Sequence, residues 1–64
     1  MERQRVLALV KLCELLEIGE SILILGKFDA TKTRFLKAKK ILENKGIGLK
    51  SSPTECGRII IRDF

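Results

Sequence analysis

The stretch that decides the fold is ATKTRFLKAKKILENKGIG, residues 30–48. It predicts one helix, because Asp29 or Thr31 can cap its start with a side-chain oxygen and Gly46 can close its end in the left-handed conformation. At about 100° per residue, this helix has two unlike faces. The apolar face consists of Phe35, Ala38, Ile41 and Leu42. The polar face consists of Lys32, Thr33, Lys37, Lys39 and Lys40. The first face requires a hydrophobic core, and the second favours an anion or water.

The charge of the chain is concentrated in its later part. The 64 residues carry a net charge of +5 at pH 7, of which −1 falls on residues 1–26 and +6 on residues 27–64. This distribution is typical of a domain with one surface that meets a polyanion, and equally of a soluble lysine-rich surface. A chain of this length forms at most one domain, so we expect a single domain over residues 1–64 that is marginally stable alone.

Residues 2–17 predict a second helix, since they contain many helix formers and neither Gly nor Pro. The apolar residues surround most of this helix instead of forming one stripe. They are Val6, Leu7, Ala8, Leu9, Val10, Leu12, Cys13, Leu15 and Leu16. So small a domain has little protein to cover such a helix on every side. Two interpretations remain open at this point, a homodimer contact through the helix and a central core helix.

The segment ESILIL, residues 20–25, is too short for periodicity to distinguish a helix from a strand. Its isoleucines favour a strand, whereas Gly26 could equally end a short buried helix. Further along, residues 47–52 and 58–62 predict two strands, and the turn-rich residues 51–57 between them contain Pro53 and Gly57. These two strands and their turn predict a β-hairpin.

The segments TRFLKAKKILENKGI and GLKSSPTECGRIIIR together resemble the second half of a winged helix-turn-helix DNA-binding domain. In that family a recognition helix ends in a pattern like Leu-x-x-x-Gly-Ile, here residues 42–47, and a hairpin called the wing follows. The resemblance spans Thr31 to Arg62 and implies an α+β fold with an N-terminal helix, a recognition helix and a C-terminal wing. Its implied function is sequence-specific binding of double-stranded DNA by a small transcriptional regulator. A homodimer through the N-terminal helix would recognise a palindromic site.

The same resemblance implies which residues contact the DNA. The start of the recognition helix would read base edges in the major groove, through Thr31, Lys32, Thr33 and Arg34. Further along the helix, Lys37 and Lys40 would meet phosphate. The wing would contact the backbone or the minor groove through Lys50, Ser51, Ser52 and Arg58.

If ESILIL is a strand, the chain instead becomes α-β-α-β-β with a three-stranded sheet. In that form it looks like small βαβ-type proteins with a Cys-Gly pair near the last strand, some of which are suspected sulfur or selenium carriers. The pair here is Cys56-Gly57, and Arg58 beside it could favour a reactive thiolate. The alternatives to DNA binding are therefore a thiol-dependent carrier using Cys56 and a basic α/β module that binds RNA or an acidic protein.

Several classes of function are disfavoured by composition. The chain has no His, its two cysteines are far apart, and no phosphate-cradling glycine loop is present. We therefore expect no enzyme, no catalytic residue, no metal and no cofactor. The absence of an export pattern and of a long apolar run predicts a cytoplasmic protein that does not span a membrane.

Overall fold

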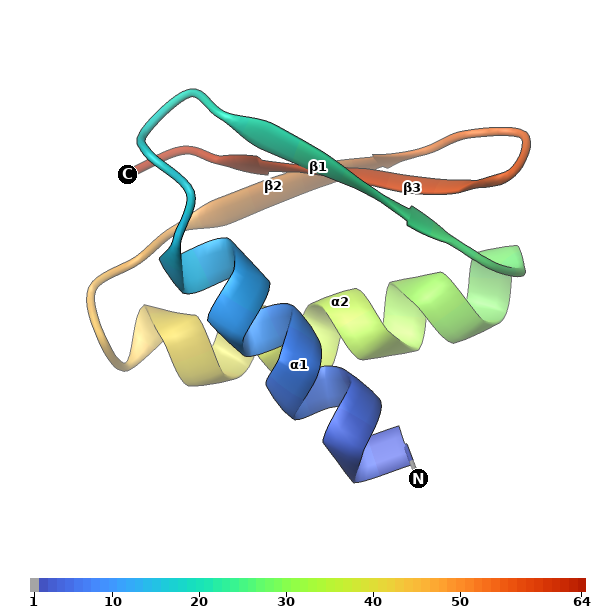
Figure 1. Cartoon of the computed structure of the whole chain (residues 1–64), viewed down its shortest axis with the longest axis horizontal. Helices are drawn as coiled ribbons and strands as arrows, with labels where there is room; N and C mark the ends of the chain where they lie inside the picture. The colour runs from blue at the N-terminus through green and yellow to red at the C-terminus, as the bar shows by residue number, and fades with distance from the viewer. Residues whose placement is uncertain (1) are drawn as a thin grey trace.

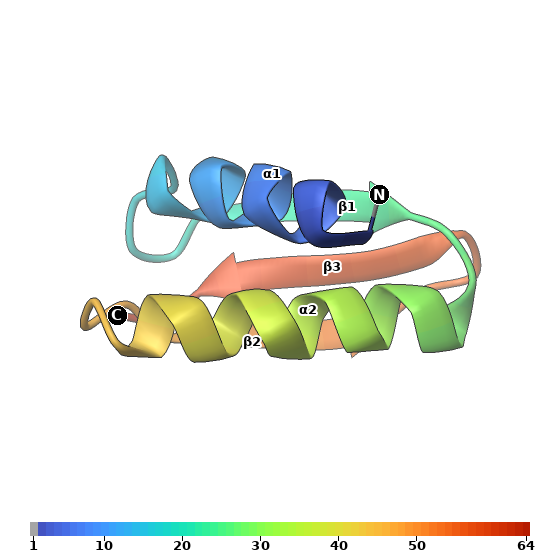
Figure 2. The ribbon, with the colours of Figure 1, turned by 90° about the horizontal axis from the view of Figure 1, so that it is seen from below.

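A computed structural model describes residues 2–64 of the chain. Two helices and three strands follow one another in the order α-β-α-β-β. They are α1 (Glu2–Glu14), β1 (Ser21–Leu25), α2 (Phe28–Glu43), β2 (Leu49–Pro53) and β3 (Gly57–Arg62). Both helices lie on one side of a single sheet (Figures 1 and 2), and the outward side chains of the sheet are exposed. The domain is therefore a two-layer α+β fold.

The ambiguous segment at residues 20–25 forms the strand β1, so the α-β-α-β-β alternative with its three-stranded sheet is confirmed. Its isoleucines, Ile22 and Ile24, are half-buried toward the helices, and Leu23 and Leu25 between them are exposed. This period-two alternation is that of a strand with one covered face. Within residues 2–64, α2 thus follows a strand, and the two-helix unit expected from the resemblance is not formed.

The last strand, β3, lies at the centre of the sheet, whose strand order is β1-β3-β2 with both pairs antiparallel. Ile60 pairs with Ile22 on one side and with Ser51 on the other, and its side chain is fully buried. The predicted hairpin is confirmed as β2–β3. Its turn is fixed by a hydrogen bond from Thr54 N–H to the carbonyl oxygen of Gly57 (2.9 Å) and one from Gly57 N–H to Thr54 Oγ1 (3.0 Å).

Helix α2 confirms the predicted apolar face and corrects the predicted start. Its side chains Phe35, Ala38 and Leu42 are buried, because the period of the helix brings them to the side that faces α1 and the sheet. The helix begins at Phe28, and its N-cap residue, Lys27, provides no side-chain hydrogen bond, so neither Asp29 nor Thr31 is the cap. At the other end Gly46 has φ +80°, which is the predicted left-handed conformation.

Helix α1 ends at Glu14, three residues before the predicted end, and a turn leads from there to Gly19 at φ +90°. One side of the helix packs into the core, through Val6, Leu9, Val10 and Cys13. The interpretation of α1 as a core helix is therefore confirmed for this side. The other side leaves Leu7, Leu12 and Leu15 exposed. No helix in the described part of the chain is long and apolar enough to cross a membrane.

Candidate nucleic-acid interface

The solvent side of α2 carries three lysines that are not neutralised by neighbours. Lys32, Lys37 and Lys40 are exposed, and none lies within ion-pair distance of an acidic side chain that the structure describes. Three other lysines are paired: Lys39 with Glu43 (3.9 Å), Lys45 with Glu14 (2.6 Å) and Lys50 with Asp63 (3.6 Å). The outward side of α2 thus carries positive charge that no ion pair with a described side chain compensates.

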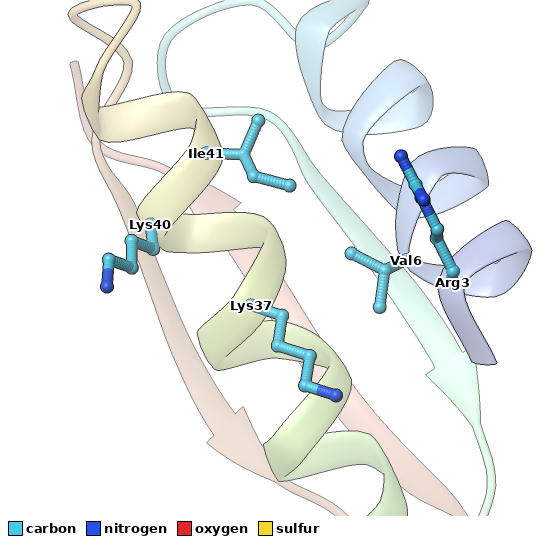
Figure 3. Close-up of a pocket in the computed structure, with 5 residues that line it drawn as sticks. All are labelled: Arg3, Val6, Lys37, Lys40 and Ile41. Atoms are coloured by element: carbon cyan, nitrogen blue, oxygen red, sulfur yellow. The ribbon is translucent and has the colours of Figure 1, made fainter.

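A groove between α1 and α2 extends this charged side. Its volume is about 350 Å³, and it is lined by Arg3, Val6, Lys37, Lys40 and Ile41. Val6 and Ile41 point into the space between the helices, Lys37 points toward α1, and Lys40 points away from it (Figure 3). The groove therefore has an apolar floor with cationic groups along its rim.

Arg3 is the member of this groove that the sequence analysis missed. It belongs to the near-neutral first part of the chain, so its charge gave no sign of a site. The spacing from Arg3 to Val6 places both on one side of α1, and only the packing of α1 against α2 brings that side beside Lys37.

Thr31, predicted to read bases, is not available for contact. Its side chain has an exposed fraction of 0%, and its hydroxyl donates a hydrogen bond to the carbonyl oxygen of Phe28 (3.1 Å). The residue lies on the same side of α2 as Phe35, one turn away, so it is part of the packed face. Lys32 and Thr33 are exposed and Arg34 is half-buried, so these three remain reachable among the predicted base-reading residues.

Arg58, predicted to contact DNA from the wing, is also buried, with an exposed fraction of 6%. It precedes Ile60 by two residues on β3, and residues two apart on a strand share a face, so it points toward the helices. Its Nη1 donates to Ser51 Oγ (2.9 Å), and its guanidinium lies 5.3 Å from the centre of the Phe28 ring. The Nε atom has no hydrogen-bond partner among the residues that the structure describes. Arg58 is therefore a structural residue of the covered sheet face.

The remaining wing residues do not join the α2 surface. Ser51 is half-buried, where it accepts the bond from Arg58. Lys50 and Ser52 pair with Ile61 and Ile59 and are exposed with them, so they lie on the open side of the sheet. The predicted helix contacts and wing contacts therefore face opposite sides of the domain.

Replacing Arg58 with methionine tests its structural role. In the wild-type protein the buried Nε–H group without a described partner destabilises the folded state by about 1–3 kcal/mol, and the change removes this group. The change also removes the hydrogen bond to Ser51 and the contact with the Phe28 ring. We expect the free energy of unfolding in urea to stay the same or rise by up to about 2 kcal/mol. Affinity for duplex DNA, measured in parallel, is expected to stay within about twofold, since the side chain does not reach the surface. A loss of DNA affinity of tenfold or more in this variant would contradict this assignment.

The two thiols lie in opposite environments. Cys13 is fully buried in the core, and burial raises the pKa of its thiol to about 11. Cys56 is exposed in the β2–β3 turn, with its sulfur 3.8 Å from the Thr54 hydroxyl. Among the side chains that the structure describes, no group of three or more Cys, Asp or Glu is placed to hold a metal ion.

Comparison with known proteins adds no relative: no family model matches the chain, and neither a curated protein nor a solved structure is significantly similar to it. The fold and this surface thus define a small α+β domain with a basic helix layer.

Proposed function

We propose that this protein binds double-stranded DNA through the outward side of α2 and the groove beside it. The proposal depends on one observation: Arg3, Lys32, Lys37 and Lys40 lie on one side of the domain, and none of them makes an ion pair with an acidic side chain that the structure describes. From Lys32 to Lys40 the helix rises about 12 Å. The same length of duplex carries about seven phosphates, counted over both strands. Several lysines can therefore meet phosphates at once.

Contacts with phosphate dominate this mode of binding. The four cations supply affinity and hold the protein on the duplex, while Thr33 and Arg34 are the side chains left to reach base edges. In the winged-helix interpretation, α2 takes the place of the recognition helix and the β2–β3 hairpin that of the wing. The strand β1 then stands where that motif has its first helix. A role as a transcriptional regulator belongs to this proposal and adds the expectation of a preferred operator.

The experiment is an anisotropy titration of labelled duplex DNA over a series of salt concentrations. Four phosphate contacts predict a slope of log K against log salt of about −3.6. The triple variant Lys32→Gln, Lys37→Gln, Lys40→Gln removes three of them, so we expect a slope near −1 and a large loss of affinity at low salt.

A matched control has the same change in net charge. Lys39→Gln, Lys45→Gln and Lys50→Gln together remove three lysines that already pair with Glu43, Glu14 and Asp63. We expect this control to retain most of the slope. Equal effects of the two triple variants would mean that only net charge matters, and the proposed surface would be wrong. Competition by single-stranded RNA stronger than by duplex DNA would favour the RNA-binding alternative.

The exposure of Cys56 supports a second candidate, a carrier that uses this thiol. With iodoacetamide at about pH 8, we expect one equivalent to react in the folded protein, at Cys56, and a second only in denaturant. The reason is that Cys13 is buried and its pKa is raised to about 11, so it presents almost no thiolate. Mass spectrometry of the labelled protein identifies the site, and Cys56→Ser should remove the fast reaction. Because Cys56 lies outside the α2 surface, the same variant should keep its DNA affinity; loss of that affinity would instead tie the thiol to binding.

A further inference from the structure

The two free edges of the sheet are not equally protected. In β1 the backbone groups that bond to β3 alternate, as the bonds from Arg62 N–H to the Glu20 oxygen (3.0 Å) and from Gly26 N–H to the Cys56 oxygen (3.0 Å) show. The amides of Ser21, Leu23 and Leu25 therefore point away from the sheet. No charged residue and no proline interrupts β1, whereas β2 at the other edge carries Lys50 and Pro53. Charges and proline are the usual means of blocking edge pairing, so β1 is the edge left open to another strand.

Helix α1 lies along the same edge of the molecule as β1 (Figure 2). Its groove side carries Arg3 and Val6, which face α2. By helical period, Ala8 and Leu12 lie on the side of α1 away from α2, and both are exposed, Leu12 at 52%. Leu15, the first residue after the helix, is 81% exposed. An apolar helix side therefore adjoins the unprotected strand edge. A partner that pairs with β1 would also cover these leucines.

The charges of α1 indicate what that partner is. Arg3 and Arg5 lie in its first turn, and Glu17 and Glu20 follow its end, beyond Lys11 in the last turn. Arg5 and Glu17 make no ion pair with a side chain that the structure describes. If a second α1 ran antiparallel to the first, the basic start of each helix would lie beside the acidic residues that follow the end of the other. The charges of α1 are therefore complementary to those of a second copy of the same helix that runs in the opposite direction.

We propose that two copies of this chain form a two-fold dimer in which β1 pairs antiparallel with β1 of the second copy and α1 packs against its counterpart. One two-fold axis perpendicular to the sheet reverses the direction of both elements, so both contacts arise from the same operation. The result is a continuous six-stranded sheet with four helices on one side. The α2 surface stays outside the interface, and the dimer is independent of the proposed DNA binding.

Sedimentation equilibrium without DNA tests the dimer. We expect the wild-type protein to sediment at twice the chain mass of 7.2 kDa. Leu12→Glu is expected to give the monomer, because it puts a carboxylate in the helix contact. Leu36→Glu is the matched control: Leu36 lies on α2 and is exposed to the same degree, at 50%, so this variant should remain a dimer. Circular dichroism of each variant reports whether it is folded.

A charge exchange tests the orientation of the helices even if Leu12→Glu fails to fold. Arg5→Glu and Glu17→Arg should each weaken the dimer about tenfold or more, and the double variant should recover most of that loss. A wild-type monomer at all concentrations would overturn the proposal. So would a dimer that tolerates Leu12→Glu but is lost in Ile59→Glu, since that result would place the contact on the open sheet face, where Leu23, Leu25, Ile59 and Ile61 are exposed.

Discussion

Replacing Gly57 with alanine is expected to leave the chain unfolded. A Cβ atom at this position would overlap the backbone carbonyl oxygen of Ile24 and would lie 2.8 Å from the Leu25 Cα, so the clash is with the backbone of β1. Gly57 is paired with Leu25 at the point where β3 leaves the hairpin turn and meets β1. Relief would require the two strands to separate. The cost therefore exceeds the roughly 1–3 kcal/mol of an ordinary overpacked site, and a domain this small rarely has more than about 3–5 kcal/mol in total.

The measurement for Gly57→Ala is far-UV circular dichroism together with a urea titration at fixed protein concentration. Gly48→Ala is the control, because a Cβ there would press only on the ring of Phe64, an exposed side chain that can move. We expect Gly48→Ala to keep a cooperative transition close to that of the wild-type protein. A folded Gly57→Ala variant with a normal transition would mean that β1 and β3 do not approach as closely as described, and the strand order itself would then be in question.

The Gly57 contact also shows where sequence analysis reached its limit. The helix period of α2 was readable because apolar residues recur over about two turns, and Phe35, Ala38 and Leu42 are indeed buried. The five residues of β1 contain no comparable repeat. Their strand conformation depends on pairing with β3, more than 30 residues later in the chain, which no local pattern encodes. The predicted start of α2 was wrong for another reason. Thr31 was considered as an N-cap because it is polar, although its position one turn before Phe35 places it on the buried side of the helix.

The candidate site was predictable to a similar extent. Lys32, Lys37 and Lys40 were identified correctly as an exposed polar face, since a helix with one apolar side must turn the other outward. Arg58 was assigned to the DNA-contacting wing by the resemblance, and the three consecutive isoleucines, Ile59 to Ile61, contain no alternation that shows which face of β3 is covered. Arg3 could not have been found, because its position beside α2 depends on how two helices pack.

Leu42→Ala is expected to destabilise the fold by about 2–5 kcal/mol. The Leu42 side chain is fully buried within the core formed by α1, α2 and the sheet, and alanine would leave a cavity there. Near the end of α2, the Leu42 carbonyl oxygen also accepts the bond from Ile47 N–H (3.0 Å), so the residue anchors the helix where the chain turns toward β2. Urea unfolding followed by circular dichroism measures the loss, at fixed protein concentration because a dimer would make stability depend on it.

Leu36→Ala on the same helix removes the same atoms from a half-exposed position, so its cost should stay below about 1 kcal/mol. The difference between the free-energy costs of the two substitutions measures how strongly the apolar side of α2 is packed against the core. It bears on function as well, because the lysines face outward only while the apolar side is fixed inward. If both substitutions cost the same small amount, α2 would not be held in this orientation, and Lys32, Lys37 and Lys40 would have no fixed common surface to offer to DNA.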